Sequence, residues 1–252
     1  MKKLISLMLL GTLAAPSFGA KVVPIDPVKE PERYKAMMEK REAHRRRTGG
    51  LIHTGTKGRI AYVNCQDKVS DEALKDVANL FTKNLRADFF VAEKPMKFEL
   101  AKAMDAVGKS GGNAAIFLVD DPSLPMSLVA MESKWALVNV HPITQDKPDA
   151  DKLKERQQKL LLRVSTVLLG GATSDLQISA MQSISSLEDL DRSKGKGVDP
   201  KSGLAMMRHL PTIGVLQDKM TSYRKACQEG WAPAPTNEYQ KAVWEQERGT
   251  KK

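Results

Sequence analysis

The sequence predicts an α/β protein of the α+β type, in which a mixed sheet carries flanking helices. Short runs rich in β-branched and aromatic residues alternate with segments of helical periodicity in the first half of the chain. A long helix follows, and the rest of the chain is predicted to be helical and irregular. That order is typical of strands joined by helices around one sheet. With 252 residues, 41% of them hydrophobic, the chain is long enough for one such domain with appendages.

The first residues have the composition of a signal peptide. Two lysines precede an apolar run over residues 4–15, which is too short to span a bilayer as a helix. Small residues then predict cleavage after Gly19, with cleavage after Ala20 as the alternative. We therefore expect an exported protein, periplasmic or secreted, from which residues 1–19 are removed. No later run reaches 18 apolar residues, so we expect no transmembrane segment in the mature chain.

Residues 20–56 predict a basic arm that begins extended and continues as a charged helix over residues 32–47. The helix is polar on nearly all sides, so it is not expected to be part of a core. The formal charge is +10, or +8 without the two lysines of the signal peptide, and half of that excess lies in this arm. A polyanion contact would use Arg41, Arg45, Arg46 and Arg47. Interspersed glutamates dilute the positive field, so we favour a solvated arm and do not expect nucleic acid as the partner.

The globular domain is predicted over residues 57–219. Strands are expected at residues 59–65, 88–92, 113–119, 128–131 and 135–140, and the third is apolar enough to be buried on both faces. Helices are expected at residues 70–85 with Ser70 as N-cap, 98–107 closed by Gly108, 150–169 and 200–209. The second half of the third of these helices is apolar nearly all round, which indicates a buried helix.

Residues 220–252 predict a helical C-terminal tail. Two helices, at residues 220–229 and 237–246, lie on either side of a proline-rich bend. The aromatic residues of the tail are Tyr223, Trp231, Tyr239 and Trp244. They offer either a surface for another protein or a belt packed on the domain, and we favour the belt. The identity of any partner is unknown from the sequence.

The two cysteines leave two interpretations open. In an exported protein, Cys65 and Cys227 are suited to a disulfide, which would close a loop of about 160 residues and add on the order of 4–5 kcal/mol. Two buried thiols are the equal alternative, because Cys65 lies in an apolar strand. Two cysteines cannot make a structural zinc site of the four-cysteine kind.

The residue types that carry chemistry are sparse. The four histidines are His44, His53, His141 and His209, and none lies within four residues of another, as zinc-binding helices require. The loop at residues 108–112 resembles parts of a P-loop and of a nucleophile elbow, but it follows a helix where both motifs need a strand. The carboxylates at residues 188–191 indicate a helix start. We therefore predict no catalytic residue, no metal ligand and no cofactor.

The stretch from residue 160 to residue 191 carries a family resemblance. An apolar helix ends at Gly170-Gly171, a polar loop follows, and then come Met181 and the segment Ser186-Leu187-Glu188-Asp189-Leu190-Asp191. This order resembles metzincins, and archaemetzincins in particular, which have a mixed sheet, a helix bearing His-Glu-x-x-His-x-x-Gly, a methionine turn and a segment Ser-Leu-x-Glu-x-Asp. The resemblance covers about residues 57–209 and implies a zincin-like fold.

The resemblance also implies a zinc site at positions where this chain lacks the ligands. Aligned on Gly170, the chain has Arg163 and Val167 at the two histidine positions, Val164 at the glutamate and Thr173 at the third ligand. Aligned on Gly171, the same positions hold Val164, Leu168, Ser165 and Ser174. Neither register supplies a histidine or a general base.

These observations favour an exported, non-catalytic metzincin-like protein, a pseudo-protease with a binding or scaffolding role. Two alternatives stay open. One is an active, zinc-dependent metallopeptidase-like hydrolase whose site has moved to His141 or His209. The other is a periplasmic polyanion-binding protein that acts through its basic arm.

Overall fold

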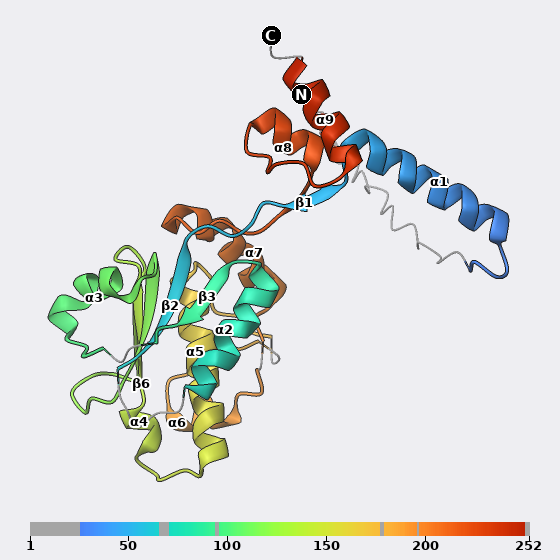
Figure 1. Cartoon of the computed structure of the whole chain (residues 1–252). Coiled ribbons are helices and arrows are strands. Elements are labelled where there is room, and N and C mark those ends of the chain that lie inside the picture. The colour runs from blue at the N-terminus through green and yellow to red at the C-terminus, as the bar shows by residue number, and fades with distance from the viewer. Residues whose placement is uncertain (1–25, 66–70, 94–95, 177–178, 196, 250–252) are drawn as a thin grey trace, which may run out of the picture. The chain divides into compact units, whose positions relative to one another are not determined.

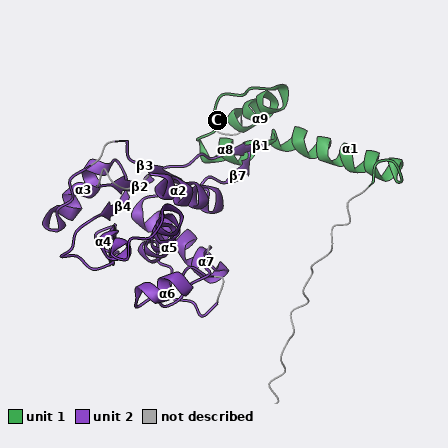
Figure 2. Cartoon of the chain, turned by 90° about the horizontal axis from the view of Figure 1, so that it is seen from below, with its two compact units in different colours: residues 1–50, 223–252 green, residues 51–222 purple. Residues whose placement is uncertain are grey.

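The computed structural model describes residues 26–65, 71–93, 96–176, 179–195 and 197–249. The predicted signal peptide and Ser70 lie outside the described residues. The chain divides into two compact units (Figure 2). Leu51–Ser222 forms one, called here the sheet unit. Both flanks of the chain form the other, called here the helical unit, which contains the predicted arm up to Gly50 and the predicted tail from Tyr223.

The sheet unit contains a five-stranded mixed sheet in the order β3-β2-β4-β6-β5. Its strands are β2 (Arg59–Asn64), β3 (Asp88–Val91), β4 (Ala114–Val119), β5 (Ser127–Ala130) and β6 (Trp135–Asn139). Strands β3, β2, β4 and β6 run parallel, and β5 pairs antiparallel with β6 at the edge. The mixed sheet that the sequence predicts is therefore confirmed.

Helices cover both faces of this sheet, with α2 (Glu72–Leu85) and α5 (Ala150–Leu168) on one side and α3 (Ala103–Ser110) on the other (Figure 1). Side chains alternate along the strands accordingly. Ile60 and Tyr62 pack with α2 and α5, whereas Ala61 and Val63 belong to the core on the α3 side. Every residue of β4 is buried, as its apolar sequence predicts for a strand covered on both faces.

The outer edge of β3 is closed by a side chain of α2. The Thr82 hydroxyl donates a hydrogen bond to the Phe89 carbonyl and accepts one from the Phe89 N–H, both at 3.3 Å. These two backbone groups point away from β2, since the ladder to β2 uses the alternate residues. The threonine therefore satisfies polar groups that an edge strand would otherwise leave open.

Two predicted helix boundaries are wrong. The second helix is a short 3₁₀ turn, η1 (Leu100–Lys102), followed by α3, which passes through Gly108 and ends at Gly111. Gly111 has φ 76°, the left-handed conformation that stops a helix, whereas Gly108 keeps helical geometry. The predicted helix at residues 220–229 starts as the strand β7 (Met220–Ser222), which pairs antiparallel with β1 (Leu51–His53). A partner strand distant in sequence overrides the local helical pattern there.

Short helices complete the sheet unit. They are α4 (His141–Thr144), α6 (Leu187–Arg192), α7 (Pro200–His209) and the 3₁₀ turn η2 (Leu210–Ile213). The carboxylate of Asp199 caps α7 by accepting from the Ser202 N–H at 2.9 Å, and proline occupies the first turn, where its missing N–H costs nothing. Residues 200–209 therefore form the helix that the sequence predicts.

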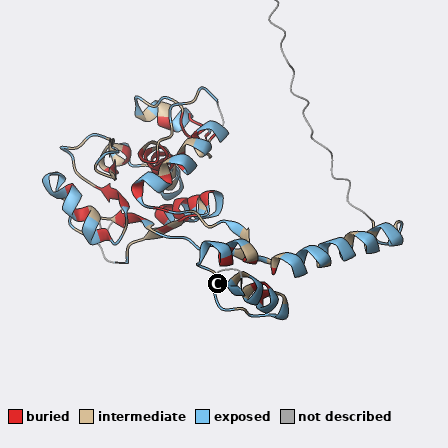
Figure 3. Cartoon of the chain, turned by 90° about the horizontal axis from the view of Figure 1, so that it is seen from above, coloured by how far each residue is buried: buried red, intermediate tan, exposed pale blue. Residues whose placement is uncertain are grey.

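The helical unit is built from α1 (Pro31–Thr48), α8 (Tyr223–Glu229) and α9 (Glu238–Gly249). Tyr223 is its buried centre. The Tyr223 hydroxyl donates to the Pro233 carbonyl at 2.7 Å, and its ring centroid lies 6.4 Å from that of Trp244. No residue of α1 is buried, and most of its residues are exposed (Figure 3). Among the described residues, none of the helices has both the length and the apolar character needed to cross a membrane.

Candidate site at the degenerate zinc helix

The second half of α5 occupies the place that the family resemblance gives to a zinc helix. In the register aligned on Gly170, Arg163 and Val167 are half-buried, Thr173 is exposed, and Val164 is only 2% exposed. Valine has no atom that binds a metal and no proton to exchange. The side chain at the glutamate position is therefore part of the core, packed with the leucines around it.

The register aligned on Gly171 gives the same result by a different contact. Ser165, at the glutamate position, is fully buried and shares a hydrogen bond of 2.9 Å with the Tyr62 hydroxyl of β2. Burial raises the pKa of Tyr62, so this phenol stays protonated. Leu168, at the second histidine position, is 1% exposed. A polar pair and an aliphatic side chain fill the space between the helix and the sheet.

Arg163, at the first histidine position, connects α5 to the turn that carries Met181. Its guanidinium donates to the Gln182 carbonyl, and burial lowers the pKa of this arginine. Met181 is buried, its N–H donates to Ser179 Oγ at 3.1 Å, and its carbonyl accepts from the Ser174 N–H at 3.0 Å. The predicted methionine turn is thus held by hydrogen bonds between protein groups.

The residues at these positions do not fit a zinc ion. Zinc in such sites takes imidazole, thiolate or carboxylate ligands, and neither register offers one. Within the described ranges, no group of three or more His, Cys, Asp or Glu side chains is close enough to hold a metal ion.

Three of the four histidines have hydrogen-bond partners in the sheet unit. His141 Nδ1 lies 3.0 Å from Asp120 Oδ1, and His53 Nδ1 lies 2.8 Å from Asp218 Oδ2. His209 Nδ1 lies 3.1 Å from the Thr212 hydroxyl, and its Nε2 is buried without a hydrogen-bond partner. His44 lies on α1, in the helical unit. The structure does not bring these histidines to one site.

An arginine that the sequence did not single out organises the other end of α5. Arg156 is 1% exposed, and its guanidinium donates to Asp191 at 2.7 and 2.6 Å and to Asp146 at 2.7 and 2.8 Å. A further hydrogen bond of 2.8 Å goes to the Ile143 carbonyl. Hydrogen bonding to Arg156 lowers the pKa of Asp191 to about 2. All five guanidinium protons are satisfied in this arrangement.

The segment Ser186–Asp191 therefore has a structural role in this chain. Ser186 Oγ accepts from the Asp189 N–H at 3.1 Å, and the Asp189 carboxylate accepts from the Ser186 N–H at 3.1 Å, which is a capping box. Hydrogen bonds from Ser185 and Ser186 lower the pKa of Asp189 to about 2. The segment starts α6, as its carboxylates predict, and delivers Asp191 to Arg156.

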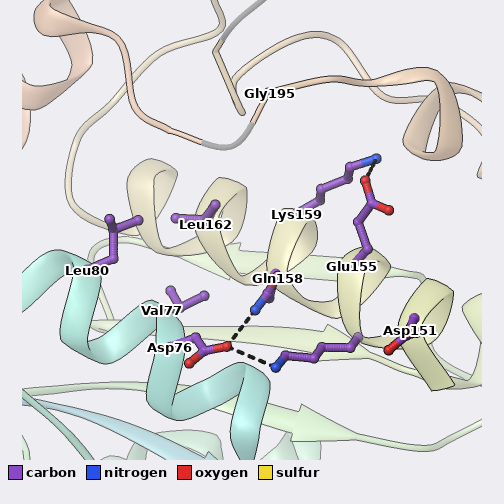
Figure 4. Close-up of a pocket in the computed structure, with 10 residues that line it drawn as sticks. Asp76, Val77, Leu80, Asp151, Glu155, Gln158, Lys159, Leu162 and Gly195 are labelled. Carbon is purple, nitrogen blue, oxygen red and sulfur yellow. Dashed lines mark hydrogen bonds and ion pairs between the residues drawn. The ribbon is translucent and has the colours of Figure 1, made fainter.

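A groove of about 310 Å³ runs between α2 and α5 (Figure 4). Val77, Leu80 and Leu162 give it an apolar lining. The Lys159 ammonium donates to the Leu190 carbonyl and pairs with Glu155, both at 3.0 Å, while Asp76 accepts from Gln158 at 2.8 Å and pairs with Lys154 at 3.2 Å. These pairs orient the charges toward each other, and no serine, cysteine or histidine is among the described residues that line the groove.

The two cysteines belong to different units. Cys65 follows β2 and is half-buried, and burial raises the pKa of its thiol to about 12. Cys227 is buried in α8. Whether the two residues are bonded stays a prediction with two alternatives, as the sequence leaves it.

The basic arm uses part of its charge inside the helical unit. The guanidinium carbons of Arg45 and Arg46 lie 5.3 and 5.8 Å from the centroid of the Tyr239 ring. The Tyr239 hydroxyl donates to the Glu42 carboxylate, which also pairs with Arg46 at 3.4 Å. Arg41 and Arg47, the other candidate polyanion contacts, have exposed side chains on α1. Of the aromatic tail, Trp231 is the most exposed, at 38%.

The fold defined by this mixed sheet and its buried helix is an α/β fold similar to that of archaemetzincins, as the sequence motifs predict. The archaemetzincin from Methanopyrus kandleri matches with 16% identity over 61% of this chain and 96% of its own, at a TM-score of 0.49. A zinc-dependent peptidase from Methanocorpusculum labreanum matches with 14% identity over 59% and 100%, at 0.46. The archaemetzincin from Archaeoglobus fulgidus, complexed with malonate, matches with 15% identity over 58% and 99%, at 0.43.

At these identities the likeness concerns the fold alone. No family model matches the sequence, and no curated protein matches it.

Proposed function

We propose that the chain is an exported pseudo-protease, a metzincin-like protein without peptidase chemistry that acts by binding or scaffolding. The observation that carries this proposal is the hydrogen bond between Ser165 and Tyr62 in the core. A general base must contact the water that it activates. The side chain at that position instead bonds to a strand of the sheet and is fully buried.

The other register supports the same conclusion. A carboxylate in place of Val164, which is 2% exposed, would be buried among leucines without a partner. Such a group is costly unless it is paired or protonated. The helix is therefore suited to packing, and a return of the missing glutamate alone would not restore a hydrolytic site.

Export is the second part of the proposal, and it rests on the first residues of the sequence. Two lysines followed by the apolar run at residues 4–15 predict a signal peptide. The expected mature chain begins at Ala20. Mass spectrometry of the protein secreted by a bacterial host tests this, and an intact Met1 would contradict it.

Metal content and peptidase activity test the first part together. We expect purified mature protein to contain far less than one zinc per chain by elemental analysis, and to leave labelled casein uncleaved. Stoichiometric zinc with hydrolysis that a chelator abolishes would overturn the proposal. The matched control is Thr173→Ala, an exposed position of the same register. Hydrolysis that comes from a contaminating protease would be unchanged in this variant, and a chelator would inhibit it to the same extent.

A relocated hydrolase is the second candidate, favoured by the contact between His141 and Asp120, since a carboxylate on Nδ1 leaves Nε2 to act as a base. Hydrolysis that is lost in His141→Gln would support it, and loss of the same activity on treatment with a chelator would identify the zinc-dependent form. Loss of activity in Asp120→Asn but not in the surface variant Glu188→Gln would strengthen that result.

A further inference from the structure

Helix α1 carries a face that the helical unit leaves uncovered. Its members recur at intervals of three and four residues, so they lie on one side of the helix. This surface, called here the basic face, consists of Arg33, Ala36, Met37, Lys40, Arg41 and His44, which line a shallow hollow of about 490 Å³. At 1.5 Å per residue the face is about 16 Å long.

The opposite side of α1 makes the contacts within the unit. Glu42 and Arg46 meet Tyr239 of α9, and helical spacing places them about half a turn from His44. Arg45, which also contacts Tyr239, lies beside Arg41 at the edge of the basic face. The basic face is therefore available in the folded unit. Its exposure does not depend on the helix coming loose from α9.

The charge of this face is one-sided. No acidic residue belongs to it, and of its three permanent cations only Arg33 pairs within the described residues, with Glu30 at 2.7 Å. Lys40 and Arg41 are exposed and have no ion pair in the described part of the chain. A negatively charged partner could therefore form ion pairs with Lys40 and Arg41 without breaking ion pairs within the described part of the chain.

The centre of the face is apolar, which narrows the kind of partner. Ala36 and Met37 lie between the cations, and an apolar centre inside a charged rim is typical of protein interfaces. A membrane-bound helix needs a wide apolar stripe, which two residues do not provide. A second copy of α1 would bring like charges together. Duplex nucleic acid is bound mainly through phosphates and has no use for the apolar centre.

From this combination we infer that the basic face of α1 binds an acidic amphipathic helix of a partner protein. Carboxylates of the partner pair with Lys40 and Arg41, and its apolar residues pack on Ala36 and Met37. The inference rests on the proposed binding role and names the surface and the partner class. A face of this size buries less than the roughly 1,200 Å² of a standard interface, so the complex is weak and salt-dependent.

The test uses the full mature chain and a fluorescent 15-residue peptide with glutamates flanking a leucine stripe, followed by anisotropy at low and high salt. Lys40→Glu is expected to weaken binding about tenfold, because it puts like charges opposite one another. Lys35→Glu makes the same charge change on the far side of the helix and is expected to change binding less than about threefold. Met37→Ser weakens binding several-fold, while Met38→Ser, on another side, does not.

Circular dichroism of each variant must show unchanged helix content, so that loss of binding is not loss of α1. Equal losses in Lys35→Glu and Lys40→Glu would overturn the inference, as would equal binding of a peptide whose leucines are replaced by glutamine. Tighter binding to duplex DNA or to phosphatidylglycerol vesicles than to the peptide would also overturn it, because the partner would then be a nucleic acid or a membrane. Absence of binding at low salt would refute it outright.

The outcome is separable from that of the proposed function. If the chain proves to be a zinc peptidase while the peptide still binds the basic face, the pseudo-protease proposal fails and this one stands. If zinc and activity are absent and the peptide does not bind, the reverse holds.

Discussion

Asp191→Asn is expected to destabilise the sheet unit, because it removes a charged acceptor from a buried arginine. Arg156 would keep Asp146 and the Ile143 carbonyl, but two donors now 2.7 and 2.6 Å from Asp191 would face a neutral amide. One amide oxygen cannot accept what two carboxylate oxygens accept, and the amide N–H₂ opposes a guanidinium N–H. The substitution therefore weakens the clamp between α5 and α6 without removing bulk.

The size of the effect follows from the pKa of Asp191, which Arg156 lowers from 3.8 to about 2. Each pKa unit corresponds to about 1.4 kcal/mol, so the full linkage is roughly 2.5 kcal/mol. The Asp191 side chain is 32% exposed, and solvent screening reduces the expected loss to about 1–2 kcal/mol. Because the folded pKa is the lower one, this stabilisation is complete above about pH 4 and is lost as the pH falls toward 2.

Urea unfolding followed by circular dichroism, at several pH values between 2 and 7, measures this difference. The free energies of the two proteins should differ by about 1–2 kcal/mol at pH 6 and converge near pH 2. Glu188→Gln is the matched control, since its exposed pair with Arg192 lies on the same short helix. A difference that stays constant with pH, or a control that loses as much, would refute the reasoning.

Two further predictions concern buried hydroxyl and thiol groups. Tyr62→Phe should lower the free energy of unfolding by about 1 kcal/mol. A double-mutant cycle with Ser165→Ala should assign most of that loss to the hydrogen bond between the two side chains, whereas additive losses would contradict the contact. Burial raises the pKa of the Cys65 thiol to about 12, so this thiol should react with iodoacetamide at pH 8 far more slowly in the folded chain than in urea. Mass spectrometry of peptides measures the two rates, and equal rates would show that the thiol is accessible.

The burial of a whole strand or helix segment could be predicted from the sequence, because a segment made mostly of apolar residues is stable only inside the protein. The apolar run in β4 and the leucine-rich half of α5 have no polar side to expose, and both are buried. The positions of a degenerate zinc helix stay a prediction, which rests on the spacing from Gly170 and Gly171. Whether those positions open into a cleft or into the core depends on Tyr62, which lies about a hundred residues earlier.

The role of Arg156 could not be predicted for the same physical reason. It lies in the charged half of α5, where a local pattern predicts a solvent-exposed face. Its partner Asp191 follows 35 residues later, in a segment whose carboxylates the sequence analysis interpreted as a helix start. The short helix that begins at the capping box of Ser186 and Asp189 carries Asp191, and only the folded chain shows that this carboxylate lies beside Arg156.

Short pairings between distant segments were also beyond local patterns. Residues 220–222 have helical periodicity with their successors, yet they form β7 because β1 provides hydrogen-bond partners. Similarly, two glycines near the end of α3 offered two stop positions. Gly111 ends the helix, since it adopts the left-handed conformation, and sequence spacing does not distinguish it from Gly108.

Because the helical unit is built from both ends of the chain, its helices are synthesised at different times. Its first helix, α1, is made early, whereas α8 and α9, which supply Tyr223 and Tyr239, are made last. At roughly 5–20 residues per second, α1 waits on the order of 10–40 s for them. During that interval an isolated helix of 18 residues is marginal in water. The sheet unit between them has time to fold first, and a truncated chain that loses only its last helices also loses the support of its first.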